Sequence, residues 1–181
     1  GTAAIASYAV ASNLVTLLYL PGNAIGLGLI TIVGQCIGAG EKGQAKQYTR
    51  QLTGINYAIL LVLCTVMIVF GGQLVGIYQL SPEASAISKQ MITAHSIAMV
   101  VWPLAFTIPY TLRASLDAKF TMAVSVFSMW VFRIAFAYLF VRVFQLGVMG
   151  VWYGMFIDWI FRAAVFSLRF HGLERRAVSV S

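Results

Sequence analysis

Three ionisable residues in the C-terminal third of the sequence could do chemistry inside a membrane. Arg133, Asp158 and Arg162 each lie within a long apolar run, and Asp158 and Arg162 are one helical turn apart. At about 1.5 Å per residue from the inner ends of their spans, Arg133 is roughly 18 Å deep and Asp158 roughly 15 Å. A lone charge at that depth is costly, so a partner or an aqueous cavity is required. We predict that Asp158 and Arg133 are partners across a helix–helix interface.

Two roles are open for these charges. The first, which we favour, is a structural ion pair that locks the last two helices together. In the second, Asp158 exchanges its basic partner for a proton or a cation during a transport cycle. Neither role needs a metal or an organic cofactor, and the sequence contains no motif for one.

The sequence lacks the residue patterns that are typical of enzyme active sites. The histidines, His95 and His171, are far apart in depth, and there is no HExxH, GxSxG, GxGxxG or GxxxxGK[ST] pattern. Cys36 and Cys64 lie in different apolar runs and predict neither a disulfide nor a metal site. The sequence therefore argues against an intramembrane enzyme, and we expect His95 to be a hydrogen-bonded structural group.

The elements that hold these charges must be membrane helices. The chain of 181 residues is 60% hydrophobic and 9% charged, with a mean hydropathy of +0.87, whereas soluble domains are about a quarter charged. No segment alternates with the period of two that barrel strands require. The sequence therefore predicts an all-α, polytopic membrane helix bundle over residues 1–170 and a polar, disordered cytoplasmic tail. About five transmembrane spans are expected at residues 5–35, 52–78, 87–112, 122–141 and 148–170, with the tail at residues 171–181.

Basic residues fall unevenly between the ends of these spans. The net charge is +7, but no basic patch is interleaved with aromatic residues, so no nucleic-acid partner is expected. If the segment after Gly40 faces the cytoplasm, the positive-inside rule places the first residue outside and the last inside. The inner basic residues are then Lys42, Lys46, Arg50, Arg113, Lys119, Arg169, Arg175 and Arg176, with only Lys89 and Arg142 near the outer ends.

Glycine and proline mark where helices pack closely or bend. In the first span, Gly22 and Gly26 share one helix face and Pro21 precedes them, which predicts a packing seam with a kink point. In the third span, Pro103 and Pro109 predict a bent or broken helix and a candidate moving part. We expect the glycine seam to pack on this bent span.

Four stretches of the sequence resemble the second lobe of a multidrug and toxic compound extrusion (MATE) transporter. They are LPGNAIGLGLITIVGQCIGAGEKGQAK, LRASLDAKF, SMWVFRIAFAYLF and GVMGVWYGMFIDWIFR. The resemblance implies an antiporter with two six-helix lobes around a central cavity, which exports organic cations in exchange for sodium ions or protons. This chain would correspond to the last five helices, and we expect it to be an excised or truncated piece that lacks the first lobe.

The resemblance also implies a cavity wall that binds the substrate. We expect the wall to include polar and aromatic side chains of the first and third spans: Asn13, Tyr19, Asn23, Trp102 and Thr107. Many members carry an acidic residue for the coupling ion in the helix that matches residues 87–112, and this sequence has none there. The resemblance therefore places no coupling site on this chain, and Asp158 is not matched to one.

Three functions remain open from the sequence. The leading expectation is a secondary active efflux transporter of the plasma (inner) membrane that works by alternating access. Its partners would be the lipid bilayer, the missing first lobe and a small organic cation. The runner-up is a lipid-linked oligosaccharide flippase of the same superfamily, whose cavity would be more cationic. The third is a non-transporting membrane subunit, against which the doubly kinked third span argues.

Overall fold

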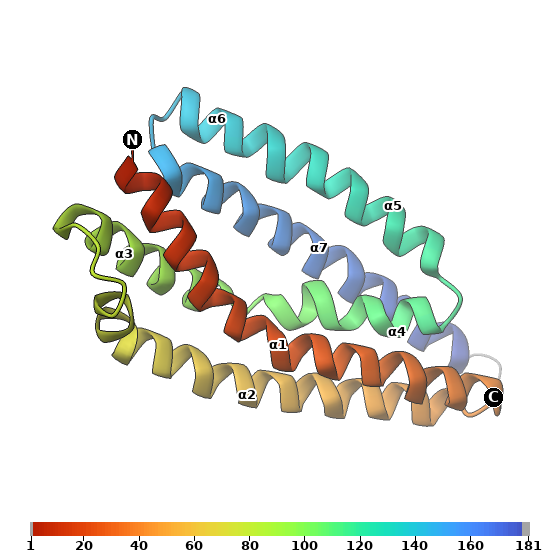
Figure 1. Cartoon of the computed structure of the whole chain (residues 1–181). Coiled ribbons are helices and arrows are strands. Elements are labelled where there is room, and N and C mark those ends of the chain that lie inside the picture. The colour runs from red at the N-terminus through yellow and green to blue at the C-terminus, as the bar shows by residue number, and fades with distance from the viewer. Residues whose placement is uncertain (1, 179–181) are drawn as a thin grey trace.

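The computed structural model describes residues 2–178, with side chains described through Gly172. Throughout these residues the regular secondary structure is helical (Figure 1). In chain order the elements are α1 (Thr2–Gly38), α2 (Lys42–Gly76), α3 (Pro82–Ala98), η1 (Pro103–Thr107), α4 (Ile108–Ala114), α5 (Ala118–Ser128), η2 (Met129–Ala135), α6 (Phe136–Arg142) and α7 (Gly147–Val178).

The helices divide into four candidate membrane spans without a break and one broken span. Helix α1, helix α2, the continuous stretch Ala118–Arg142 and the part Gly147–Gly172 of α7 are each long and apolar enough to cross a membrane. Helix α3 and the stretch Pro103–Ala114 pass the same test only together, and they are bent by 66° at their junction. The prediction of an all-helical bundle with about five spans is confirmed.

Two element boundaries differ from the prediction. Helix α2 begins at Lys42 rather than at residue 52, so the basic segment after the turn forms the first turns of the span itself. At the other end of the chain, α7 continues to Val178, so the prediction of a disordered tail is wrong for residues 171–178. Leucine, glutamate and arginine favour helix, and no proline interrupts the segment. Residues 179–181 lie outside the described residues.

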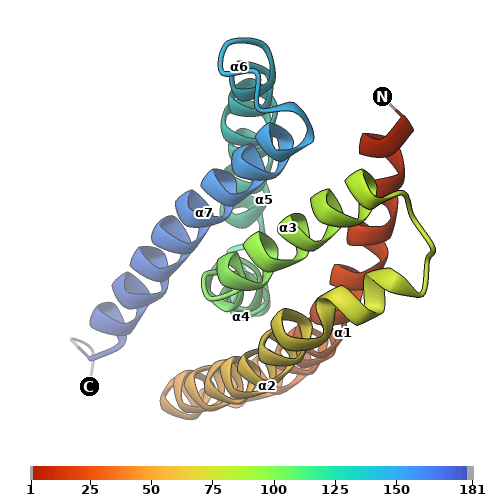
Figure 2. The ribbon, with the colours of Figure 1, turned by 90° about the vertical axis from the view of Figure 1, so that its left-hand side faces the viewer.

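The broken span occupies the centre of the bundle. Figure 2 shows α3 between the α1–α2 pair and α7. The stretch α5–η2–α6 packs chiefly on α7, and α1, α2 and α7 all contact the broken span. The largest buried core joins α1, α2, the broken span and α7, and its members include Leu18, Leu60, Met91, Trp102 and Trp159.

Two glycines let α1 approach the broken span closely. A Cβ atom built on Gly22 would overlap the ring of Trp102, and one built on Gly26 would overlap the ring of Tyr110. Both rings belong to the broken span, so the seam meets the element on which it was expected to pack. Pro21 lies inside the uninterrupted helix, and α1 changes direction along its length (Figure 1).

The break in the central span lies between Ala98, where α3 ends, and Pro103. Pro103 opens the π-helical turn η1, in which the amide of Ile108 donates to the Pro103 carbonyl five residues earlier. Proline cannot donate a backbone hydrogen bond, so the ladder of α3 cannot continue unchanged through this point. Pro109 lies in the first turn of α4. The predicted bend is therefore present, and it coincides with a π-helical turn, a feature frequent at functional sites.

Leucine in place of Gly26 is expected to separate α1 from Tyr110, because overpacking a tight interface costs about 1–3 kcal/mol. The melting temperature of the purified protein in detergent should fall, while membrane insertion during expression should be unchanged. Gly34→Leu is the matched control, since a Cβ built on Gly34 meets nothing within 4 Å. Equal melting temperatures for the two variants would contradict the seam.

Candidate functional site

Asp158 forms its ion pair within its own helix. Its side chain is 0% exposed, and its Oδ1 accepts from Nε of Arg162 at 2.8 Å. The predicted pair between Asp158 and Arg133 is therefore wrong. Residues four apart on a helix already face each other, so Arg162 meets the carboxylate without requiring any particular position of the neighbouring helix.

Arg162 also contacts two elements outside α7. Its Nη2 donates to the backbone carbonyl of Ser125 in α5 at 3.1 Å. Its guanidinium lies over the ring of Phe106 in η1, with 5.7 Å between Cζ and the ring centroid. Arg162 therefore connects α7 with α5 and η1, while Asp158 balances its charge.

The positive charge of Arg133 is not balanced by a carboxylate within the described part of the chain. This residue lies in η2 and is exposed, and its Nη2 contacts Sδ of Met155 at 3.7 Å, a weak interaction. Of the three predicted intramembrane charges, Asp158 and Arg162 are brought together and Arg133 is left on an accessible face.

A group of rings surrounds His95, which we call the His95 cluster. The rings come from α1, α3, α7 and the region of η1. The members are Tyr19, His95, Trp102, Phe106, Trp152, Phe156 and Trp159.

His95 is fully buried at the centre of this cluster. Its Nε2 lies 2.6 Å from the hydroxyl of Tyr19, which agrees with the expectation of a hydrogen-bonded histidine. The centroid of its ring lies 4.8 Å from that of Trp152 and 5.2 Å from that of Trp159, and both pairs meet edge to face. The contacts join α1, α3 and α7 at one point of the bundle.

The cluster has an interior and an accessible edge. The three tryptophans are buried, whereas Tyr19, Phe106 and Phe156 are half-buried. These three rings come from α1, η1 and α7 respectively. Each of these elements therefore contributes one incompletely buried ring to the cluster, and the buried tryptophans pack against these rings.

The five predicted cavity-wall residues do not form one surface. Asn13 and Asn23 are exposed on α1, and Tyr19 is half-buried in the His95 cluster. The structure departs from the prediction at Trp102 and Thr107, which are both buried. Trp102 lies under Gly22 of α1. The Thr107 hydroxyl accepts from Nδ2 of Asn56 at 2.8 Å, so it serves a contact with α2.

The sequence analysis missed the contribution of α7 to this site. Trp152, Phe156 and Trp159 follow one another at spacings of four and three residues, which places them on one helix face. That pattern was visible in the sequence, but it does not distinguish a ligand-facing stripe from a packed core. Phe106 carried no comparable signal, because the turn of η1 decides where it points.

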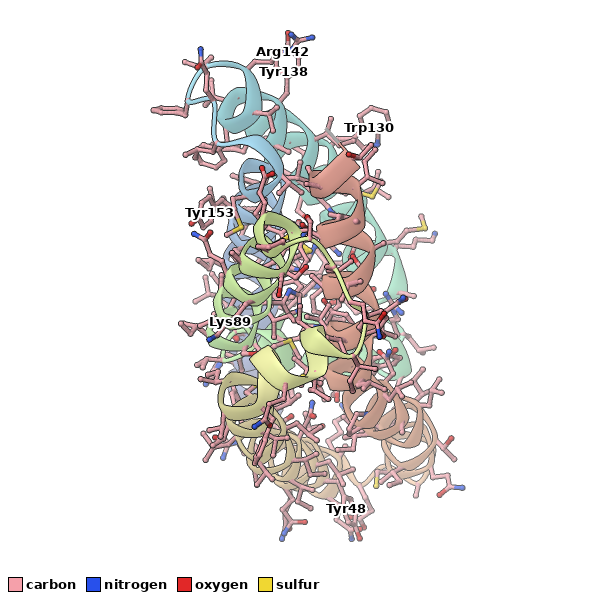
Figure 3. All side chains as sticks on the ribbon, turned by 60° about the vertical axis from the view of Figure 1, so that its left-hand side comes forward. Tyr48, Lys89, Trp130, Tyr138, Arg142 and Tyr153 are labelled. Atoms are coloured by element: carbon pink, nitrogen blue, oxygen red, sulfur yellow. The ribbon has the colours of Figure 1, made fainter. Side chains whose placement is uncertain are left out.

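Aromatic and charged side chains also mark the two ends of the molecule. Figure 3 shows Tyr138 and Arg142 together at the end formed by α6, and Tyr48 at the opposite end. Near the start of α5, Arg169 pairs with Asp117 at 2.7 Å and lies over the ring of Phe120 at 4.8 Å. Tyrosine and basic residues at such positions anchor membrane proteins at the lipid–water interfaces.

These features define a class of protein. A bundle of membrane-length helices around one broken span, with ionisable residues at depth, is the architecture of a polytopic membrane transporter. The MatE family model matches residues 1–139, and the chain belongs to that family. Proteins of this family are transporters rather than enzymes.

Two curated relatives show how much of a family member the chain represents. It is 27% identical over 180 residues to the probable multidrug resistance protein NorM of Thermotoga maritima, covering 98% of this chain and 39% of that protein. It is 26% identical over 154 residues to the probable multidrug resistance protein YoeA of Bacillus subtilis, covering 85% of this chain and 33% of that protein. The chain therefore spans a third to two fifths of the length of these relatives.

Solved structures show the same fold. An outward-facing multidrug resistance MATE family transporter of the MOP superfamily aligns with a TM-score of 0.85 at 19% identity, over 97% of this chain and 40% of the other. An inward-facing structure of such a transporter aligns with a TM-score of 0.75 at 20% identity, over 96% of this chain and 43% of the other. The bundle described here is thus the fold of one part of these transporters.

Removing the positive charge of Arg162 is expected to destabilise the protein much more than removing that of Arg133. Arg162→Met leaves the carboxylate of Asp158 buried and unpaired, which typically costs about 3–5 kcal/mol. Arg133→Met breaks only a weak contact with a sulfur atom. Melting temperatures in detergent measure the difference. Equal losses for the two arginines, or a larger loss for Arg133→Met, would contradict the observed pairing.

Proposed function

We propose that this chain forms the second lobe of a secondary active efflux transporter, which exports organic cations or drugs in exchange for sodium ions or protons. The observation that carries the proposal is the accessible edge of the His95 cluster. Tyr19, Phe106 and Phe156 present half-buried rings from three different elements. Such faces attract flat organic cations by cation–π and stacking contacts, without requiring one specific substrate.

The broken span supports an alternating-access mechanism. It contacts α1, α2 and α7 and contains a 66° bend, so a change in the bend would move the rings of α1 and α7 relative to each other. Discontinuous helices near substrate sites are typical of secondary transporters. Because the sequence contains no nucleotide-binding motif, an ion gradient is the proposed energy source.

The other wall of the cavity is proposed to come from a first lobe. The chain spans 39% of the length of the Thermotoga maritima relative, which leaves room for a lobe of at least similar size. Asn13 and Asn23 are exposed on α1 and would face that lobe or the substrate. The basic residues predicted on the inner side favour a plasma (inner) membrane location with a cytoplasmic C-terminus.

A lipid-linked oligosaccharide flippase is the second candidate, and one observation favours it. Arg133 is exposed and contacts no carboxylate among the described side chains, whereas the charge of Asp158 is balanced by Arg162. The accessible charge of this group of residues is therefore positive. A positive charge attracts a lipid phosphate and repels an organic cation, so the two candidates differ in the role of Arg133.

Proteoliposomes that contain the complete transporter test the first candidate. Ethidium efflux should require an imposed sodium or proton gradient. Phe156→Leu should raise the KM for ethidium roughly 2- to 30-fold, which corresponds to the loss of one cation–π contact of about 0.5–2 kcal/mol. Phe70→Leu is the matched control, since Phe70 is an exposed residue of α2 outside the cluster. An equal KM for the two variants would contradict an aromatic substrate site.

The same vesicles can decide between the candidates. A flippase would translocate a fluorescent lipid-linked oligosaccharide, and Arg133→Gln would abolish that activity. For a cation exporter, Arg133→Gln should leave ethidium efflux intact or increase it, because a repulsive charge is removed. The absence of flux of either compound under every gradient would refute both functions.

A further inference from the structure

We propose that Asp158 is a proton-binding site of this lobe and that Arg162 transmits its protonation state to α5 and the broken span. The inference rests on the proposed transport function, which it deepens by naming one site for the coupling ion. It starts from the arrangement of the two carboxylate oxygens. Oδ1 accepts from Arg162, whereas Oδ2 is buried and has no hydrogen-bond partner within the described residues.

A buried carboxylate oxygen without a partner is costly, since native structures satisfy nearly all such atoms. Asp158 is 0% exposed, so bulk water does not reach this oxygen in the described conformation. A proton added to Oδ2 would neutralise the carboxylate and give this oxygen an O–H group. The site can therefore hold either a charge balanced by Arg162 or a proton.

The surroundings favour a proton over a metal cation. The guanidinium of Arg162 lies 2.8 Å from Oδ1 and repels any further cation. Where the structure describes side chains, no group of three or more His, Cys, Asp or Glu residues is placed to hold a metal ion. A sodium ion at Asp158 would therefore be coordinated by one carboxylate and repelled by the adjacent guanidinium. A proton requires only one free oxygen atom to which it can bind, and Oδ2 provides it.

The other charged and titratable groups on this side of α7 come from three elements. Arg133 of η2 contacts Met155, and His95 of α3 lies against Phe156 and Trp159. Tyr19 of α1 lies against His95 and Trp159. The contacts from α5 and η1 to Arg162 are the Ser125 carbonyl and the Phe106 ring, neither of which titrates. We assign the described ion pair with Arg162 to the arrangement before a proton binds.

Protonation of Asp158 would remove the charge that compensates Arg162. The Arg162 side chain is only 11% exposed, and an uncompensated charge at that burial is unfavourable. Arg162 must then move, and its hydrogen bond to Ser125 and its contact with Phe106 are lost or rearranged. Ser125 lies four residues before the π-helical stretch η2 and Phe106 lies within η1. One proton thereby acts on both irregular helical segments.

Distances between spin labels in the complete transporter test this coupling. Cysteines for labelling replace Met122 on α5 and Leu168 on α7, which are 64% and 74% exposed. Lowering the pH should shift the distance distribution of the otherwise unchanged protein. Asp158→Asn, which mimics the protonated acid, should show the low-pH distribution at every pH. Its ethidium efflux should lose the response to a proton gradient.

The matched control is Asp117→Asn, which removes the carboxylate of the ion pair between Arg169 of α7 and Asp117 at the start of α5. It should retain the pH-dependent shift. If Asp158→Asn does not fold, Asp158→Glu replaces it and should change the midpoint pH of the shift. The proposal would be overturned if the midpoint pH in Asp158→Glu were unchanged, or if the distances in Asp158→Asn still shifted with pH. It would also be overturned if sodium at constant pH shifted the distances in the otherwise unchanged protein.

The outcomes separate this inference from the proposed function. A distance shift that depends on Asp158, in a protein that transports nothing under any gradient, would support the proton site and refute the transport function. Ethidium efflux driven by a proton gradient that survives in Asp158→Asn would support the function and refute the site.

Discussion

The broken central span is the constraint on which the rest of this bundle depends. Pro103 removes a backbone donor in a region where no water is available, so the rearranged backbone must be enclosed by protein. The structure meets this need from three sides, since α1, α2 and α7 all contact the span. Gly22 and Gly26 allow α1 to come close, and the Asn56–Thr107 hydrogen bond attaches α2. The same enclosure brings the rings of the His95 cluster together.

The arrangement of the charged groups follows from a second constraint, the free-energy cost of an unpaired charge inside the membrane-spanning part of the protein. Asp158 and Arg162 satisfy it within one helix, and Arg162 extends the pair to α5 and η1. Arg133 pairs with no carboxylate among the described side chains and is exposed on η2. A second lobe or an aqueous cavity beside that face would supply what the bundle alone does not. The arrangement is that expected of one half of a transporter rather than of a closed structural unit.

Membership of the MatE family, established over residues 1–139, agrees with these features. The family resemblance extended to the fold, but it supplied no coupling residue on this chain. The structure offers a physical candidate in the unpartnered oxygen of Asp158. Of the residues expected in a cavity wall, Trp102 and Thr107 are buried, whereas Phe106 and Phe156, which were not expected there, are half-buried. These side chains and Asp158 have directions that depend on how helices are rotated against one another.

The sequence by itself determined the class of fold, the number of spans and the position of the break. Hydropathy sets the spans because the bilayer requires about 20 apolar residues for each helix. Proline within a span favours a kink or a break because it lacks a backbone donor, although α1 continues through Pro21. Only the tertiary structure decided that Asp158 pairs with Arg162 rather than Arg133, and that Tyr19, His95 and Trp159 meet. Such contacts depend on the rotation and separation of helices, and these are set by packing between elements that the periodicity of one helix does not describe.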